Sequence, residues 1–283
     1  MRAEHLLRAS ANLGEGPVWD EANQEIVWVD ILAGSINRVS IDGKEGLSLK
    51  LPVPVGAVAP TVNGSWVAAT PKGLESITHG FAVGGIPRIG KNLRMNDGKS
   101  DPQGRFVGGT MSMGAPQEKA GTLWSIYDNK AIPLVQETTI SNGLDWSSDG
   151  TTLFYIDTPT QQIDAFDYEL ATGKVSNRRV WASVPSEMGA PDGMCIDTES
   201  RLWVALWGGG AVICIEDGKI VERIEVPTPQ VTCPVFAGPE LDQLVITTAA
   251  LDLDTDSPGA GDLYISSPGT KGNLPNTLGA WAC

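Results

Sequence analysis

Short apolar segments alternate with polar turns along almost the whole chain. The apolar runs include "EIVWVDI", "SWVAAT", "RFVGGTM", "TLFYID", "LWVAL" and "LVITTA". Pairs such as Asp42-Gly43 and Asn63-Gly64, which favour tight turns, separate many of them. Long stretches with apolar residues at helical spacing are hard to find. The pattern therefore predicts an all-β protein.

One arrangement of strands and turns recurs six times along the sequence. The copies align on positions separated by steps of 40, 42, 45, 50 and 41 residues, namely Gly16, Gly56, Gly98, Gly143, Gly193 and Pro234. Repeats of roughly 40–50 residues with several strands each are typical of β-propeller blades. We predict a six-bladed β-propeller that forms a single domain over residues 1–283. A β-sandwich is the alternative, but it does not predict the recurrence.

The residue before each alignment point belongs to a ring, because the first strand of each blade is expected to lie nearest the central channel. The ring consists of Glu15, Val55, Asp97, Asn142, Asp192 and Cys233. Four of these six side chains carry oxygen donors. Since a buried carboxylate is costly unless it is paired or coordinated, the ring predicts a divalent metal site in the channel.

Taken one at a time, these residues have ordinary explanations. Asn142-Gly143 and Asp192-Gly193 are typical turn dipeptides, and Glu15 alone could be a solvated loop residue. The shared repeat phase favours a common site, because turn residues have no need to match from blade to blade. We still expect the two glycines to mark turns.

Charge excludes some classes of partner. The chain of 283 residues has 34 acidic and 20 basic side chains, and its formal charge of −14 argues against sequence-independent binding to nucleic acid or anionic membranes. No apolar stretch is long enough to span a membrane, and the N-terminus lacks the apolar core of a signal peptide. We expect a soluble cytoplasmic protein.

Histidine and cysteine are too sparse for several kinds of active site. The two histidines are His5, in a terminal arm, and His79, in a "THG" turn, so a Ser-His-Asp triad or a multi-histidine zinc site is not expected. The cysteines are widely spaced, and Cys195 and Cys214 lie in apolar runs that favour buried free thiols. Chemistry must therefore rest on carboxylates, amides, arginine or a metal.

Several longer motifs occur together in the order "GEGPVWDEANQEIVWVDI", "RMNDGKSDPQGRFVGGTM", "ISNGLDWSSDGTTLFYID" and "PDGMCIDTESRLWVALWGG". On these motifs the sequence resembles the SMP-30/gluconolactonase/luciferin-regenerating-enzyme family over nearly its whole length. The resemblance implies a six-bladed propeller that binds one divalent cation at the channel mouth and opens sugar lactones.

The resemblance also implies residue roles. The implied metal ligands are Glu15, Asn142 and Asp192, and the implied substrate contacts are Arg94 and Asn96. The motif favours Asn96 where the ring gives Asp97, which we keep as a supporting candidate.

The chain departs from one branch of the family after the "GTM" motif. That branch continues with a pair of acidic residues, whereas this chain has Ser112, Met113 and Gly114 there. We expect different contacts to the hydroxyl groups of the sugar.

The predicted activity is metal-dependent hydrolysis of a sugar acid (aldono-) lactone to the open-chain sugar acid. The cofactor is one divalent ion, with Ca²⁺, Mg²⁺, Mn²⁺, Zn²⁺ and Fe²⁺ all compatible with oxygen ligands. Asp192 is the candidate general base, and hydroxide on the metal is the alternative. Two other classes stay open: a related metal-dependent esterase or phosphotriesterase, and a calcium-binding regulatory propeller. The sequence selects neither the lactone nor the oligomeric state.

Overall fold

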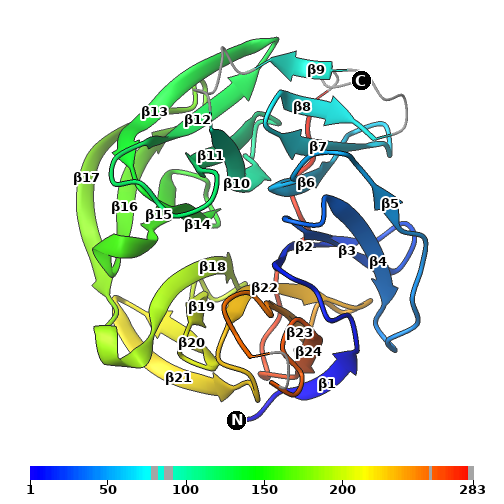
Figure 1. Ribbon diagram of the computed structural model, residues 1–283. Helices are drawn as coiled ribbons and strands as arrows, with labels where there is room; N and C mark the ends of the chain where they lie inside the picture. Colours follow the sequence, from blue (N-terminus) through cyan, green and yellow to red (C-terminus); the bar gives the residue numbers. More distant parts are fainter. Residues whose placement is uncertain (78–81, 86–91, 255–256, 280–283) are drawn as a thin grey trace.

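Twenty-four strands and two short 3₁₀ helices make up the described part of the protein. The structure is a computed structural model that describes residues 1–77, 82–85, 92–254 and 257–279, so His79 and Cys283 lie outside the described residues. The strands form six four-stranded antiparallel sheets arranged as blades around a central channel (Figure 1). The predicted all-β, six-bladed β-propeller is confirmed. None of the described residues forms a helix long and apolar enough to cross a membrane.

The first three blades each use four consecutive strands. Blade 1 contains β2 (Gly14–Asp20), β3 (Glu25–Asp30), β4 (Ser35–Ser40) and β5 (Leu49–Lys50). Blade 2 contains β6 (Ala57–Pro60), β7 (Trp66–Thr70), β8 (Gly73–Ser76) and β9 (Ala82–Gly85). Blade 3 contains β10 (Leu93–Ser100), β11 (Phe106–Ser112), β12 (Gly121–Tyr127) and β13 (Lys130–Thr138).

The last three blades follow the same plan, with one exception at the end. Blade 4 contains β14 (Ser141–Trp146), β15 (Thr152–Asp157), β16 (Gln162–Glu169) and β17 (Lys174–Ser183). Blade 5 contains β18 (Ala190–Ile196), β19 (Leu202–Trp207), β20 (Ala211–Glu216) and β21 (Lys219–Glu225). Blade 6 contains β22 (Val231–Ala237), β23 (Gln243–Thr248), β24 (Leu263–Ser266) and, as its outer strand, β1 (Glu4–Leu7). The 3₁₀ helices are Thr158–Thr160 and Ser186–Met188.

Strand β1 closes the ring, because the N-terminal strand completes the C-terminal blade. His5 pairs with Tyr264 in the β1–β24 ladder, and its Nε2 lies 3.0 Å from Oδ2 of Asp262. The expectation that His5 lies in a terminal arm is therefore wrong. The sequence pattern of β1 is too short and too polar to be recognised as a strand without its partner.

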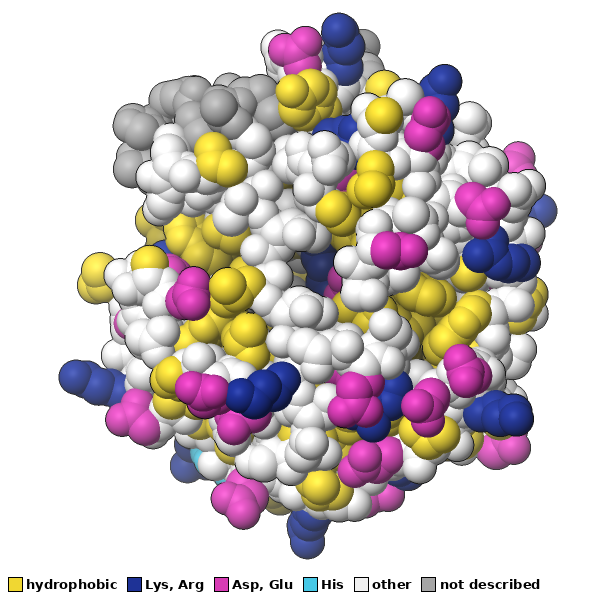
Figure 2. Space-filling model, turned by 180° about the vertical axis from the view of Figure 1, so that it is seen from behind, with side chains coloured by type: hydrophobic (Ala, Val, Ile, Leu, Met, Phe, Trp, Pro, Cys, Tyr) yellow, Lys and Arg dark blue, Asp and Glu magenta, His cyan; other side chains and the backbone are white. Residues whose placement is uncertain are grey.

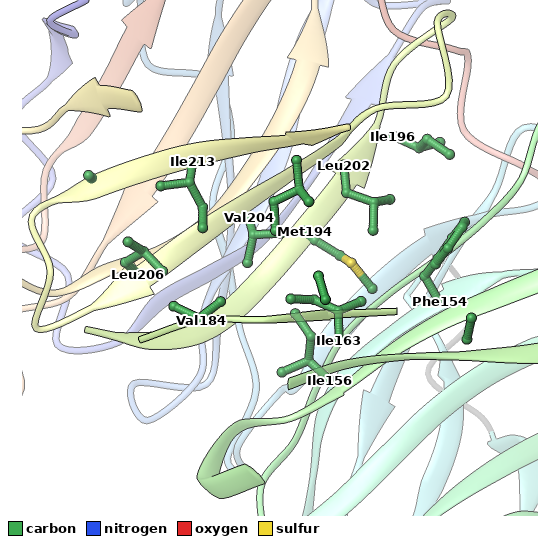
Figure 3. Close-up of a cluster of buried hydrophobic side chains, with 14 residues drawn as sticks. Phe154, Ile156, Ile163, Val184, Met194, Ile196, Leu202, Val204, Leu206 and Ile213 are labelled. Carbon is green, nitrogen blue, oxygen red and sulfur yellow. The ribbon is translucent and has the colours of Figure 1, made fainter. Parts of the chain in front are cut away.

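The hydrophobic core is divided among the contacts between neighbouring blades. The buried apolar side chains of the described residues form six clusters, one between each adjacent pair of blades. Figure 3 shows the cluster between blades 4 and 5, where Ile156 and Ile163 face Met194 and Val204. Each blade is therefore stabilised mainly by burying its two faces against its neighbours.

The inner strands carry irregularities at the predicted ring. The pairing register shifts between Ser141 and Leu144 in β14 and between Pro191 and Met194 in β18, so that the Asn-Gly and Asp-Gly pairs lie inside strands as β-bulges. The expectation that these glycines mark turns is wrong. Turn dipeptides and bulges attract the same small and polar residues, and only the pairing distinguishes them.

The glycines instead allow neighbouring inner strands to approach each other. A Cβ atom on Gly143 would lie 2.5 Å from the backbone oxygen of Asp192, and one on Gly193 would lie 2.6 Å from Cβ of Cys233. Both distances are too short for real contacts. A side chain at either position would push adjacent blades apart at the channel wall.

We predict that Gly143→Ala lowers the free energy of unfolding by about 3 kcal/mol, because the added methyl group meets backbone that cannot move alone. Gly64→Ala is the control, since no atom lies within 4 Å of the added Cβ and only its positive φ of 80° opposes the change. That control should cost about 1 kcal/mol. Urea unfolding of both variants checks this, and equal losses would contradict the packing role of Gly143.

Candidate functional site

Four inner strands bring the predicted site residues to the channel wall. Strand β2 carries Glu15, β10 carries Arg94, Asn96 and Asp97, β14 carries Asn142, and β18 carries Asp192. All six side chains are buried, with exposed fractions of 4–7%. In Figure 1, β10, β14 and β18 are consecutive inner strands, whereas β6 separates β2 from β10 and β22 separates β2 from β18. Bulges in β10, β14 and β18 interrupt the regular alternation of side chains at the site.

The bulges decide which residue of blade 3 matches Asn142 and Asp192. In blades 4 and 5 the bulge consists of the residue pair 142–143 and the pair 192–193, with the oxygen-bearing side chain first. In blade 3 the register shifts between Met95 and Gly98, so Asn96 is the first residue of the bulge and Asp97 the second. The equivalent position is therefore Asn96, and the repeat alignment on Gly98 was one residue out of register.

A network of amide and guanidinium hydrogen bonds joins three of these residues. Arg94 Nη1 donates to Asn96 Oδ1 at 2.6 Å and to the Met95 carbonyl at 3.0 Å. Asn96 Nδ2 donates to Asn142 Oδ1 at 3.1 Å and to the Ser141 carbonyl at 2.9 Å. The bonds hold Arg94, Asn96 and Asn142 in one buried row, and Asn142 Oδ1 keeps a second lone pair for another partner.

A second chain of hydrogen bonds continues from blade 4 to blade 5. Asn142 Nδ2 donates to Thr158 Oγ1 at 2.9 Å, and that hydroxyl donates to the Pro191 carbonyl at 2.9 Å. Thr158 thereby fixes the side chain of Asn142 relative to the strand that carries Asp192. Sequence reasoning missed Thr158, because it follows a strand in a "DTP" segment with no sign of its contacts.

The carboxylates of the site lack positive partners. Glu15 Oε2 accepts a hydrogen bond from the Gly16 amide at 2.8 Å, whereas buried Oδ1 of Asp192 and Oδ2 of Asp97 have no partner among the described residues. Arg94 is the cation whose charge acts on both Glu15 and Asp192. Lys99 acts on Asp97, but it is itself paired with Asp145. Two cations therefore face four carboxylates, which leaves an excess of negative charge.

The excess charge raises the pKa values of the carboxyl groups. Burial, together with the nearby charge of Asp97, raises the pKa of Glu15 to about 8. Burial and the charges of Glu15 and Asp97 raise the pKa of Asp192 well above its ordinary value. Burial lowers the pKa of Arg94 to about 10, although Glu15 and Asp192 oppose this shift. Such mutual perturbation in a buried cluster is typical of functional sites.

The donor set fits a hard divalent cation. Two carboxylates and an amide supply oxygen atoms only, and an unpartnered buried carboxylate oxygen is satisfied when a cation binds beside it. Within the described ranges, no group of three or more histidine, cysteine, aspartate or glutamate side chains is arranged to hold a metal. The candidate set differs from such groups because its third member is the amide of Asn142.

Residues 13–250 match the family described as SMP-30/Gluconolactonase/LRE-like region. The chain belongs to this family. It is 36% identical to regucalcin of Xenopus laevis over 98% of each chain. This extensive match agrees with the resemblance seen in the sequence motifs.

Solved structures of family members have the same fold. A calcium-binding protein, regucalcin, from Agrobacterium tumefaciens superposes with a TM-score of 0.91 at 28% identity, covering 98% of this chain and 97% of that one. A gluconolactonase from Xanthomonas campestris has a TM-score of 0.73 at 22% identity, covering 90% of this chain and 86% of that one. The second likeness concerns the fold alone.

The segment after the "GTM" motif forms a surface loop anchored by Ser112. Ser112 Oγ donates to the Ala115 carbonyl at 2.9 Å and accepts from the Gln117 amide at 2.9 Å. Its hydroxyl is therefore occupied by the loop itself, while Met113 is 41% exposed. This neutral loop carries no carboxylate at residues 112–114, in contrast to the family branch with an acidic pair.

We predict that Glu15→Gln raises the melting temperature of the metal-free protein at about pH 8.5 by a few degrees. Because the folded-state pKa of Glu15 is raised to about 8, the folded protein binds more protons than the unfolded chain between about pH 4.5 and 8, and stability falls as the pH rises through this window. The glutamine cannot ionise, so the penalty disappears.

Thermal unfolding in the presence of a chelator measures this effect. The variant and the wild type should melt alike below about pH 3.5, where Glu15 is mostly protonated in both the folded and the unfolded state. Glu118→Gln is the control, because Glu118 is exposed and its substitution should leave the alkaline melting temperature unchanged. A Glu15→Gln protein that melts below the wild type at pH 8.5 would contradict the charge excess.

Proposed function

We propose that the protein is a metal-dependent lactonase that hydrolyses a sugar acid lactone to the open-chain acid. The observation that carries the proposal is the buried cluster of Glu15, Asn142 and Asp192, in which Oδ1 of Asp192 has no partner among the described residues and Arg94 lies beside the carboxylates. Membership of a family that includes gluconolactonases supports this reaction class.

Glu15, Asn142 and Asp192 would hold one divalent cation, with two negative charges and one neutral oxygen. When bound, the cation polarises the lactone carbonyl and stabilises the negative charge that develops on its oxygen. Three protein ligands leave coordination positions for substrate and water, as catalytic sites require. All-oxygen ligation suits Ca²⁺, Mg²⁺ and Mn²⁺ best, while Zn²⁺ and Fe²⁺ are also compatible.

Arg94 and Asn96 would orient the substrate. Arg94 uses Nη1 for Asn96 and the Met95 carbonyl, so its other N–H groups are available to oxygen atoms of the lactone. Asn96 is fixed by its bonds to Ser141 and Asn142. Because Asn96 in turn accepts a hydrogen bond from Arg94, the guanidinium is held in place without the substrate. A preorganised guanidinium lowers the entropy cost of aligning the carbonyl.

Asp192 would act as the general base. Its carboxylate accepts a proton from water while the water oxygen attacks the carbonyl carbon. The bond from the carbonyl carbon to the ring oxygen then breaks, and the proton is transferred to that oxygen to give a hydroxyl group and a carboxylic acid. Oδ1 of Asp192 has no hydrogen-bond partner among the described residues, so this oxygen is available to accept the proton.

Calcium binding without catalysis is the second candidate function. It is favoured by the likeness to the regucalcin of Agrobacterium tumefaciens, which is described as a calcium-binding protein. The same residues would hold the ion, so the two candidates differ in whether lactone is consumed. A metal-dependent esterase or phosphotriesterase is a third class that would use the same site.

Removal of the metal tests the cofactor and the reaction together. Chelation should abolish acid release from a panel of aldonolactones in a pH-stat, because no protein cation takes the place of the ion. Re-supply of individual divalent metals should restore activity with at least one of them. Aryl esters and organophosphates assayed in parallel distinguish the third class, and metal binding without hydrolysis of any substrate would favour the second.

Replacement of the base tests the mechanism. Asp192→Asn and Asp192→Ala should each lower kcat at least about 100-fold, because both the proton acceptor and a negative ligand are lost. Asp97→Asn is the matched comparison, since Asp97 belongs to the same buried charge cluster but occupies the second bulge position. We expect a smaller loss there. Near-normal turnover in both Asp192 variants would rule out the assignment.

A further inference from the structure

Lys99 joins the three inner strands that carry the site residues of blades 3, 4 and 5. Its Nζ donates to Oδ2 of Asp145 at 2.9 Å and to the Met194 carbonyl at 2.7 Å. Lys99 lies in β10, Asp145 in β14 and Met194 in β18. One side chain therefore bridges three consecutive blades.

These contacts lie two or three residues further along each strand than the candidate site residues. Lys99 follows Asn96 by three residues, Asp145 follows Asn142 by three, and Met194 follows Asp192 by two. At about 3.3 Å per residue, the contacts are roughly 7–10 Å from the site along each strand. The offset from the site is similar on all three strands. Lys99 therefore holds the strands in a fixed register along the channel axis.

Asp145 is itself held firmly, so the bridge is well defined. Its Oδ2 also accepts the Ile196 amide of β18 at 3.2 Å, and its Oδ1 accepts the Trp146 amide at 2.9 Å. The Lys99 and Asp145 side chains are only 25% and 19% exposed. Although burial opposes the charge of Lys99, Asp145 raises the pKa of the ammonium, so the bridge persists at neutral pH.

The exposed part of Lys99 faces a cavity at the other end of the channel. This cavity of about 500 Å³ is lined by Lys99, Asp145 and Cys195 and by residues 273–276 of the C-terminal tail. Figure 2 shows this face, with a basic side chain visible in the central hollow. None of the six candidate site residues lines the cavity, so Lys99 lies between the site and the opposite mouth.

We propose that Lys99 is a positioning residue that fixes Asn96, Asn142 and Asp192 relative to one another. The inference rests on the proposed function, because it takes these three residues to form the metal and substrate site. Small shifts between the strands separate the ligands, and a metal site tolerates only small changes in ligand distance. Outer groups that orient ligands typically contribute 10–100-fold to metal affinity or activity.

A merely structural ion pair elsewhere between the same blades provides the matched control. Arg105 Nε contacts Oδ2 of Asp101 at 2.6 Å, and its Nη2 donates to the Leu170 carbonyl of the neighbouring blade at 2.6 Å. The Arg105 side chain is 10% exposed. It follows the far end of β10 and contacts none of the site strands of blades 4 and 5.

The experiment compares Lys99→Met with Arg105→Met in the full chain. Isothermal titration calorimetry with Ca²⁺ and with Mn²⁺ measures metal affinity, a lactone assay measures kcat and KM, and thermal unfolding measures stability. Lys99→Met should weaken metal binding roughly 10–100-fold and lower kcat by a similar factor. Arg105→Met should lower the melting temperature but keep wild-type affinity and kcat. Lys99→Arg retains a cation for Asp145 and should recover most of the affinity.

The readouts separate the failure of this inference from the failure of the proposed function. Wild-type affinity and kcat in folded Lys99→Met would overturn the positioning role alone. Metal binding by the wild type without hydrolysis of any lactone would overturn the function alone, because affinity still reports on Lys99. If Lys99→Met does not fold, Asp145→Asn tests the same bond, and unchanged affinity in that variant would overturn the inference.

Discussion

The close approach of neighbouring inner strands is the constraint on which the site depends. Backbone of one blade passes so near the next that Gly143 and Gly193 have no room for a side chain. Blades 3 and 4 are also close, since Asn96 donates hydrogen bonds to the Ser141 carbonyl and to Asn142. Residues separated by about fifty positions in the sequence thus become neighbours through backbone packing.

The same packing concentrates negative charge that the apoprotein does not neutralise. Glu15, Asp97 and Asp192 are buried together, and Arg94 is shared between two of them. A fold that served stability alone would place apolar or paired side chains there. The sequence instead keeps carboxylates there. Under the proposed function a divalent cation would offset their charge, and metal affinity would then be coupled to folded-state stability.

The fold was predictable because its signal is repeated. Six copies of one strand pattern give the blade number even where one copy is irregular, and each β-rich run reports on its own strand. The site residues were harder to predict. Their alignment between blades depends on β-bulges, and bulges are defined by the pairing of two strands and not by one sequence segment. The repeat alignment gave Asp97, whereas the pairing gives Asn96 as the match to Asn142 and Asp192.

Contacts that depend on three-dimensional neighbours left no pattern to detect. Thr158 and Lys99 each act on other blades. Lys99 lies in the "RMNDGKSDPQGRFVGGTM" motif, but the motif does not show which residues of blades 4 and 5 it contacts. Strand β1 is similar, since four residues acquire their conformation only by pairing with β24. Local propensity therefore explains most of the strands, and long-range pairing explains the parts that were missed.

The closure of blade 6 has a consequence for biosynthesis. Strand β1 is made first, but its partner β24 emerges from the ribosome only after more than 250 further residues, as the pairing of Leu7 with Leu263 shows. Until then β1 has an unpaired edge, and the apolar cluster between blades 6 and 1 is incomplete. The ring of blades can therefore close only after the last blade has been synthesised. Until then, the unpaired edge of β1 can pair with strands of other chains and cause aggregation.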